Sequence, residues 1–172
     1  MATPSDPVTN IVLTGFMGVG KTTIGRRVAD VVQRRFVDTD DVIVQRAGMS
    51  IPQLFVLFGE PHFRALEREI AHELAGETRL VIATGGGMLV NDENRAALSK
   101  TGFVVCLDAP PELIEERLKK TQDRPLAANW RDLFQKRQAA YGAIPLHISV
   151  AGKTTDQTAQ EIIALWRTTA ST

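Results

Sequence analysis

The run from Gly15 to Thr22 has the clearest chemical potential, because it reads GFMGVGKT. This satisfies G-x-x-x-x-G-K-[ST], a pattern in which backbone N–H groups surround a phosphate, the lysine reaches the outer phosphates and the hydroxyl ligates Mg²⁺. An apolar run precedes it, and the helical pattern that begins at Lys21 adds its positive dipole end. The alternative is a chance glycine-rich turn, which the strand before and the helix after disfavour. The spacing therefore predicts a site for a phosphate-bearing ligand.

Two carboxylates, Asp38 and Asp40, follow the next apolar run of the chain. One of them could hold Mg²⁺, directly or through water, while the other could accept a proton from a substrate hydroxyl. The alternative is a solvated turn with a helix N-cap, and we prefer that interpretation for Asp41. The spacing by itself leaves both interpretations open for Asp38 and Asp40.

A glycine triplet, Gly85 to Gly87, follows the third apolar run. A turn needs one or two glycines, so three indicate a backbone that approaches a ligand closely, with a flexible loop as the alternative. Arg64, Arg124 and Arg137 lie in segments expected near the same place. A single arginine is more often a solvated surface group, but three in such segments indicate that some of them bind anions.

The histidines and the cysteine predict neither a metal site nor a nucleophile. His72 begins the run HELAG, which fails the pattern H-E-x-x-H, and His62 and His147 have no ligand partners at metal spacing. Cys106 lies in the middle of a predicted strand, so we interpret it as a small buried apolar residue. Prolines at a helix start explain the segment after Asp108 without any ligand.

Strands and helices alternate along the chain. Five short apolar runs predict strands at 11–13, 36–37, 80–83, 103–107 and 146–150. The first four are nearly continuous, as in strands buried on both faces of a parallel sheet, whereas the fifth alternates and is expected nearer an edge. Helical patterns occupy 21–35, 50–59, 60–75, 92–98, 111–120, 130–141 and 156–167.

This alternation predicts an α/β domain with right-handed crossovers. Ser50, Asn129 and Asp156 are expected helix caps, and Gly59 is an expected stop. Ligands of such folds bind beyond the carboxyl ends of the strands, where the glycine-rich run, the two carboxylates and the glycine triplet all lie.

The composition excludes several classes of protein. The chain has 172 residues, with 20 Lys and Arg against 20 Asp and Glu, and 44% hydrophobic residues. These values exclude a disordered chain, and the neutral charge argues against nucleic acid or an anionic membrane as the main partner. One cysteine cannot form an internal disulfide, no apolar run reaches the ~20 residues of a membrane span, and residues 1–10 do not read as a signal peptide. We expect a single cytoplasmic domain over 1–172, monomeric, with loose termini at 1–9 and 168–172.

With these residues assembled, the chain resembles the shikimate kinase family from about Asn10 to Trp166. The motifs follow the family order: GFMGVGKTTIG, FVDTDDVI, SIPQLFVLFGEPHFRALE, ATGGGM, RPL and KRQAAY. The resemblance implies a P-loop NTPase-type three-layer α/β/α sandwich with a central five-stranded parallel sheet, similar to nucleoside monophosphate kinases and with a lid at about 121–129. It also implies transfer of the ATP γ-phosphate to the 3-hydroxyl of shikimate, in chorismate and aromatic amino-acid biosynthesis.

On the nucleotide side, the resemblance implies that the ATP phosphates are wrapped by Gly18, Val19, Gly20, Lys21, Thr22 and Thr23. Lys21 would contact the transferring group, Thr22 would bind Mg²⁺ and Asp38 would hold the metal through water. Arg124 would close over the phosphates from the lid, and Arg117 would stack near adenine.

On the acceptor side, the resemblance implies that Asp40 binds shikimate hydroxyls and acts as the candidate base. Arg64 and Arg137 would grip the shikimate carboxylate. The ring would lie against Gly85, Gly86 and Gly87, and the pocket walls would be Phe55 and Phe63.

Several positions depart from the common family pattern, among them Val44, Ala127, the stretch 138–140 after Arg137, and Pro145. They lead us to expect altered packing or affinity rather than another reaction. Another small-molecule kinase of the same fold, for gluconate or a nucleoside monophosphate, would have to explain Arg64 and Arg137 in another way. A nucleotide-binding pseudoenzyme should lack Lys21, Asp40 or the lid arginine, and all three are present.

Overall fold

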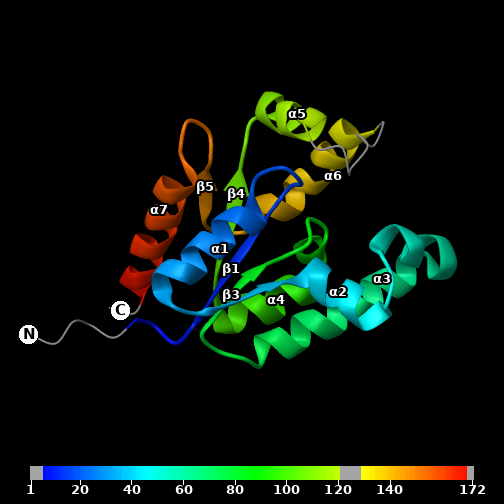
Figure 1. The fold of residues 1–172 in the computed structure, drawn as a ribbon, viewed down its shortest axis with the longest axis horizontal. Helices are drawn as coiled ribbons and strands as arrows, with labels where there is room; N and C mark the ends of the chain where they lie inside the picture. The colour runs from blue at the N-terminus through cyan, green and yellow to red at the C-terminus, as the bar shows by residue number, and fades with distance from the viewer. Residues whose placement is uncertain (1–5, 121–128, 170–172) are drawn as a thin grey trace, which may run out of the picture.

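The computed structural model describes residues 6–120 and 129–169 (Figure 1). Within these ranges a parallel five-stranded sheet has the strand order β2-β3-β1-β4-β5. Its strands are β1 (Asn10–Gly15), β2 (Arg35–Asp38), β3 (Leu80–Ala83), β4 (Gly102–Asp108) and β5 (His147–Ser149). The fifth strand lies at an edge, as its alternating sequence predicts. The expected parallel sheet is confirmed.

The central strand explains why the predicted strands are continuously apolar. β1 pairs with β3 on one side and with β4 on the other, and all six of its residues are buried. Successive side chains of a strand point to opposite faces, so Ile11 and Leu13 join one hydrophobic cluster while Val12 joins a second. Each face is covered by helices, which leaves no position for a solvated side chain.

Helices lie on both sides of this sheet, which gives the predicted three layers (Figure 1). The first cluster collects residues from α1 and α7, and the second collects residues from α3 and α4. α5 and α6 follow β4 in the chain, before and after residues 121–128. The helices are α1 (Lys21–Val32), α2 (Thr39–Ala47), α3 (Ile51–Ala75), α4 (Asp92–Thr101), α5 (Pro111–Lys120), α6 (Trp130–Gly142) and α7 (Thr155–Thr168), with a 3₁₀ turn η1 at Met88–Val90.

The helix ends differ from the expected caps at two places. α2 is capped by Asp38, whose carboxylate accepts from the N–H of Asp40, so Asp41 lies in the first turn and is not the cap. α7 is capped by Thr154 in a capping box with Gln157, two residues before the expected Asp156. In both cases a suitable oxygen lies earlier in the chain and reaches the first free N–H groups of the helix.

α3 contains a break at the residue predicted to stop a helix. Ser50 caps it in a capping box with Gln53, as expected. Gly59 then leaves the helical conformation, with φ 79° and ψ 170°, and the helix resumes at once. This φ lies in the region that glycine tolerates best. Two helical arms therefore meet at Gly59, and the second arm carries Arg64.

Residues 6–9 are held in place rather than loose. Asp6 pairs with Arg167 at 2.7 Å, and the Thr9 hydroxyl accepts from the Trp166 indole at 3.1 Å. Arg34 donates to the Thr9 carbonyl at 2.8 Å. The sequence prediction missed these contacts because their partners lie far away along the chain.

Arg124, Ala127 and nearly all of the predicted lid lie outside the described residues. In the described part of the chain, no single helix has both the length and the apolar character needed to cross a membrane. Among the described helices, only α2 and α3 taken together reach that length and character, as a pair bent by 87°.

Candidate active site

The glycine-rich run lies between the end of β1 and the start of α1, so it forms a P-loop. Gly20 caps α1 with φ 97°, a left-handed conformation that lets the chain turn into the helix. The Lys21 ammonium donates to the carbonyl oxygens of Gly15 and Phe16 at 2.8 and 3.0 Å. The loop therefore joins a cation to a helix N-terminus, which together form an anion site.

Thr22 and Asp38 bring two hard oxygen ligands together at the edge of the P-loop. The Thr22 hydroxyl donates to the Asp38 carboxylate at 2.7 Å, across the ends of α1 and β2. Asp38 is held by its second oxygen, which caps α2. A hydroxyl and a carboxylate suit Mg²⁺, which prefers oxygen ligands and retains waters. These two residues therefore fit a Mg²⁺ site beside the phosphates.

Asp40 lies against the glycine triplet. A Cβ added to Gly85 would lie 2.5 Å from the Asp40 carboxylate, so only glycine allows this close approach. The Gly85 N–H donates to the Thr39 hydroxyl at 2.8 Å, which ties the start of α2 to the loop after β3. Gly86 lies next to the P-loop, because a Cβ there would be 3.5 Å from the Gly15 carbonyl oxygen. The two loops and Asp40 therefore share one edge of the sheet.

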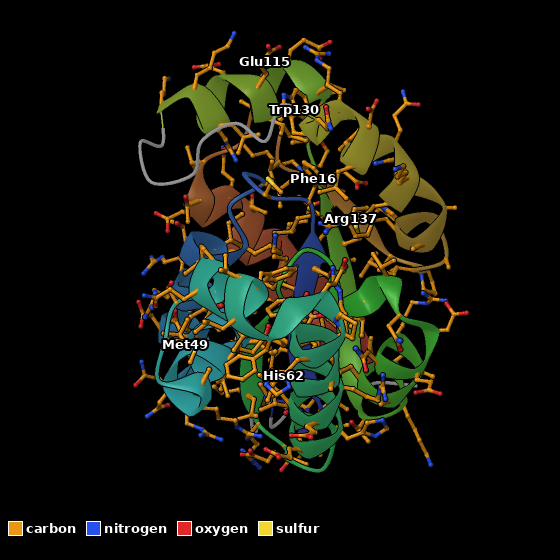
Figure 2. All side chains as sticks on the ribbon, turned by 90° about the vertical axis from the view of Figure 1, so that its right-hand side faces the viewer. Phe16, Met49, His62, Glu115, Trp130 and Arg137 are labelled. Carbon is orange, nitrogen blue, oxygen red and sulfur yellow. The ribbon has the colours of Figure 1, made fainter. Side chains whose placement is uncertain are left out.

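Two arginines converge on Gly87 from different helices. A Cβ added to Gly87 would lie 2.5 and 3.0 Å from the two terminal nitrogens of Arg64, and 3.1 Å from Nη2 of Arg137. Arg64 comes from α3 and Arg137 from α6. Figure 2 shows Arg137 beside Phe16 of the P-loop, with its guanidinium 5.7 Å from that ring. Two forked cations around one glycine suit a bidentate anion such as a carboxylate.

Arg64 is held from both sides by glutamates. Nη1 donates to Glu67 at 2.6 Å, while Nε and Nη2 donate to one oxygen of Glu60 at 3.2 and 3.1 Å. Burial, the largest influence, lowers the pKa of Arg64, but both glutamates together exceed it and raise that pKa. Arg64 thus remains charged with its terminal nitrogens directed at Gly87.

Glu67 contacts Arg64 in the candidate site, although the sequence analysis gave it no role. Its side chain is only 2% exposed. Burial is the largest influence and raises its pKa, the charge of Asp40 adds to the increase, and the hydrogen bond and charge of Arg64 oppose it. The signal was available, because Glu67 ends the quoted motif GEPHFRALE one helical turn after Arg64.

Tyr141 is a second residue that the sequence analysis quoted without a role. Its hydroxyl donates to the Gly86 carbonyl at 2.6 Å, which anchors the glycine triplet from α6. Burial raises the pKa of Tyr141 to about 12, so the phenol keeps its proton. Tyr141 lies one helical turn after Arg137, so α6 contributes both an anion ligand and a support for the loop.

The remaining predicted residues occupy three places. Arg117 of α5 donates to the Gly18 carbonyl at 3.0 Å, which places it on the P-loop. Phe55 and Phe63 contact each other with ring centroids 4.8 Å apart and planes tilted by 42°, in the hydrophobic cluster under α3, and the Arg64 guanidinium lies over the Phe63 ring. The Val19 side chain is buried in the core, so it contributes to the loop only its backbone. Thr23 is exposed in the first turn of α1, and Arg124 lies outside the described residues.

Comparisons with known proteins show which family the chain is similar to. A family model described as shikimate kinase matches residues 17–167. The shikimate kinase of Caldanaerobacter subterraneus subsp. tengcongensis is 41% identical over 160 residues, which cover 90% of this chain and 94% of that relative. A solved shikimate kinase from Acinetobacter baumannii in complex with shikimate is 36% identical, covers 93% of each chain and has a TM-score of 0.85.

A more distant solved structure shares the fold alone. A gluconokinase from Sinorhizobium meliloti has a TM-score of 0.62 at 14% identity, over 95% of each chain. The family model, in contrast, spans most of the sequence, and the first relative retains 41% identity. The chain therefore belongs to the shikimate kinase family.

Proposed function

We propose that this member of the family transfers the γ-phosphate of ATP to the 3-hydroxyl of shikimate, which gives shikimate 3-phosphate and ADP. The observation that carries the proposal is the convergence of Arg64 and Arg137 on Gly87, with Asp40 at Gly85 and the P-loop beside Gly86. A phosphate donor and a small hydroxylated carboxylate would then meet at one edge of the sheet.

The acceptor side matches the chemistry of shikimate. A carboxylate can accept hydrogen bonds from both guanidinium groups at Gly87, and charged hydrogen bonds of this kind are among the stronger ones in proteins. Asp40 would accept hydrogen bonds from ring hydroxyls, while the glycine triplet leaves room for the ring. The related enzyme from Acinetobacter baumannii, solved in complex with shikimate, supports this assignment.

The residues of this chain would act mainly by positioning. Phosphoryl transfer requires the attacking oxygen and the leaving oxygen to lie in line, with the charge of the transferring group neutralised. Lys21, Arg117 and, from outside the described residues, Arg124 would supply positive charge to the phosphates. Asp40 would orient the 3-hydroxyl and accept its proton as the oxygen–phosphorus bond forms.

Thr22 and Asp38 would hold the Mg²⁺ that accompanies ATP. When bound there, the ion would supply positive charge that neutralises the phosphates. The hydrogen bond between Thr22 and Asp38, which brings their oxygens together, supports this assignment. We further propose that the enzyme works as a cytoplasmic monomer without nucleic acid or membrane partners, in keeping with its neutral charge.

A coupled ADP-release assay tests the reaction directly. With ATP, Mg²⁺ and shikimate, we expect ADP release in a 1:1 ratio with loss of shikimate. Quinate and gluconate serve as comparison substrates, because each also carries a carboxylate and hydroxyls. We expect shikimate to have the highest kcat/KM of the three. Turnover of gluconate without turnover of shikimate would reject the proposed acceptor and leave the P-loop assignment intact.

A further inference from the structure

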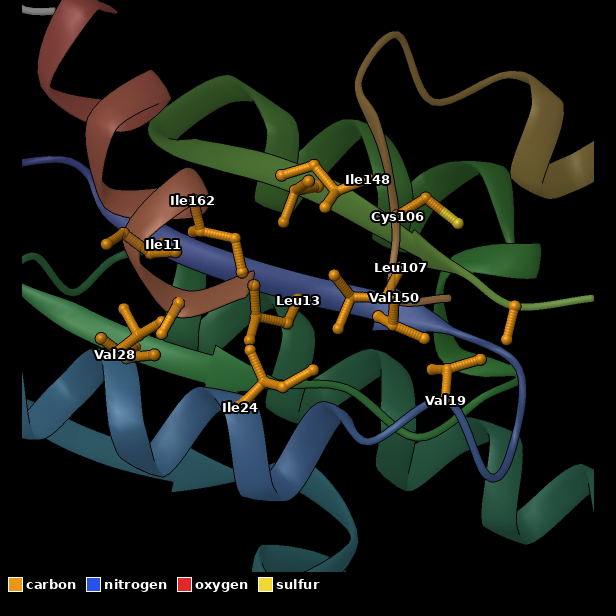
Figure 3. Close-up of a cluster of buried hydrophobic side chains, with 14 of the residues drawn as sticks. Ile11, Leu13, Val19, Ile24, Val28, Cys106, Leu107, Ile148, Val150 and Ile162 are labelled. Carbon is orange, nitrogen blue, oxygen red and sulfur yellow. The ribbon is translucent and has the colours of Figure 1, made fainter. Parts of the chain in front are cut away.

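Three potential metal ligands lie together on β4 and β5, and none of them has a role in the proposed phosphate or acceptor site. Cys106 and Asp108 are two residues apart on β4, so their side chains share a face, and His147 is the register partner of Cys106 on β5. Their ligand atoms all lie within 4.8 Å of one another. The sequence analysis found no metal partner for His147, because these residues are separated by up to 41 positions. Figure 3 shows Cys106 next to Leu107 on β4, with Ile148 close by.

The contacts of His147 direct its Nδ1 at Asp108. Nε2 lies 3.0 Å from the Tyr141 carbonyl oxygen, which can only accept, so Nε2 faces a hydrogen-bond acceptor. Nδ1 lies 2.7 Å from an oxygen of Asp108. A metal ion bound by both atoms would widen this separation to about 3.3 Å, the spacing of tetrahedral zinc ligands.

The third ligand and the adjoining space are compatible with a metal ion. The Cys106 sulfur lies 3.7 Å from the other oxygen of Asp108. Tetrahedral zinc ligands lie about 3.3–3.6 Å apart, given metal–ligand bonds of about 2.0–2.3 Å. A cavity of about 190 Å³ adjoins Asp108 and His147, which is ample room for a water as a fourth ligand.

We propose that Cys106, Asp108 and His147 form a binding site for a divalent transition metal of the zinc class, with its fourth position open to the cavity. A thiolate and an imidazole select such metals over Mg²⁺, which prefers the oxygen pair at Thr22 and Asp38. The Tyr141 carbonyl accepts the hydrogen of Nε2 and thereby directs Nδ1 toward the metal, as is usual for histidine ligands.

Binding has a definite chemical cost. Burial raises the pKa of the Cys106 thiol to about 12, and the charge of Asp108 adds to this, so the sulfur keeps its proton without a metal. A bound metal would replace the thiol proton, and that proton would leave to solvent. The site would therefore bind metal less tightly than one whose thiolate is already formed.

The location links the site to both loops of the proposed active site. Phe16 and Val19 of the P-loop line the same cavity as Asp108 and His147. Tyr141, whose carbonyl meets His147, donates its hydroxyl to Gly86. A metal ion would thus join β4, β5 and α6 behind the P-loop.

Spectroscopic titration of tag-free protein, stripped of metal with a chelator, tests the proposal. Co²⁺ added to the full chain should produce a thiolate-to-cobalt charge-transfer band at one equivalent, because Cys106 is the only cysteine. Zn²⁺ should then abolish the band by competition. A cobalt spectrum without a thiolate band would overturn the proposal, since binding at the oxygen pair of Thr22 and Asp38 cannot produce one.

Variants identify the ligands. His147→Gln should weaken Zn²⁺ binding by at least about 10- to 100-fold, the loss usual for a partner that merely orients a ligand. Cys106→Ala should remove the charge-transfer band, and His62→Gln, on α3, should change neither measurement. Circular dichroism and ATP binding check that each variant folds. Equal Zn²⁺ affinity in wild type, His147→Gln and Cys106→Ala would reject the site.

Discussion

The two sides of the proposed active site are built in different ways. The phosphate side is one continuous segment, Gly15 to Thr22, in which a strand, a loop and a helix start follow each other in the chain. The acceptor side combines Asp40 from α2, Arg64 from α3, the glycine triplet after β3 and Arg137 from α6. This side places the guanidinium groups of two arginines around Gly87, and Glu67 accepts a hydrogen bond from one of them, Arg64.

The difference shows what each side depends on. Backbone N–H groups and a helix dipole form the phosphate site, so its geometry follows from local conformation. The acceptor site depends on side chains whose spacing is set by packing between α3, α6 and the sheet. Substitutions on the acceptor side should therefore change shikimate parameters without changing those of ATP, and the reverse should hold on the phosphate side.

The largest effect is expected where the two sides meet, at Asp40. Asp40→Asn should lower kcat by about 10²–10⁴-fold, because the amide can neither accept the hydroxyl proton nor orient the hydroxyl as well. Steady-state kinetics with both substrates measure the change. Asp41→Asn is the matched control, since the Asp41 side chain is exposed and its ion pair with Arg26 is long, at 3.9 Å between Oδ2 and Nη2. Near-normal turnover in Asp40→Asn would remove Asp40 from the proposed mechanism.

Arg137→Ala should separate the two sides most clearly. The loss of a charged hydrogen bond should weaken shikimate binding by about 1.5–3 kcal/mol, which is about 10- to 150-fold, and leave ATP binding unchanged. Isothermal titration with each ligand measures the two dissociation constants. Arg131→Ala, on the exposed face of the same helix, is the control. Equal losses for both ligands would indicate that α6 supports the whole site rather than the acceptor side.

Glu67→Gln should raise the shikimate KM by about 5- to 10-fold, since Arg64 loses a charged partner. Burial raises the pKa of Glu67, so acid protonates it above the usual glutamate value of about 4.3. In wild type the shikimate KM should therefore rise as the pH falls through that pKa, whereas in Glu67→Gln it should stay high and flat.

The stability effect of Glu67 has the opposite sign. A carboxyl whose pKa is raised on folding stabilises the folded state below that pKa, and this contribution is lost as the pH rises through it. Thermal melts of wild type and Glu67→Gln across this range measure the difference, with exposed Glu69→Gln as control. In the kinetic experiment, a wild-type shikimate KM that does not change with pH would contradict a role for the Glu67 charge in holding Arg64.

The smallest effect is expected on the phosphate side, at Arg117. Arg117→Ala removes the hydrogen bond to the Gly18 carbonyl and should raise the ATP KM by about 2- to 10-fold, with no change for shikimate. Lys120→Ala, exposed on the same helix, is the control. A larger change for shikimate than for ATP would contradict the separation of the two sides.

The departures from the family pattern show how local the sequence information is. Val44 is exposed on α2, Pro145 is exposed before β5, and neither is among the nearest neighbours of Gly87. Ala127 lies outside the described residues. The expectation of altered affinity at these positions stays a prediction, and the packing around Val44 and Pro145 gives it no physical cause.

The sequence by itself determined the strand and helix order, the parallel sheet and the P-loop, because periodicity, glycine spacing and the GKT run act over a few residues. Only the tertiary structure decided which distant side chains meet. It placed Glu67 against Arg64 and Tyr141 against Gly86, and it made Asp38 rather than Asp41 the helix cap. It also brought His147 to Asp108 and Cys106, although the spacing of these residues predicts no metal site. Such contacts depend on how β4, β5 and α6 pack, and packing is not encoded in the distance between residues along the chain.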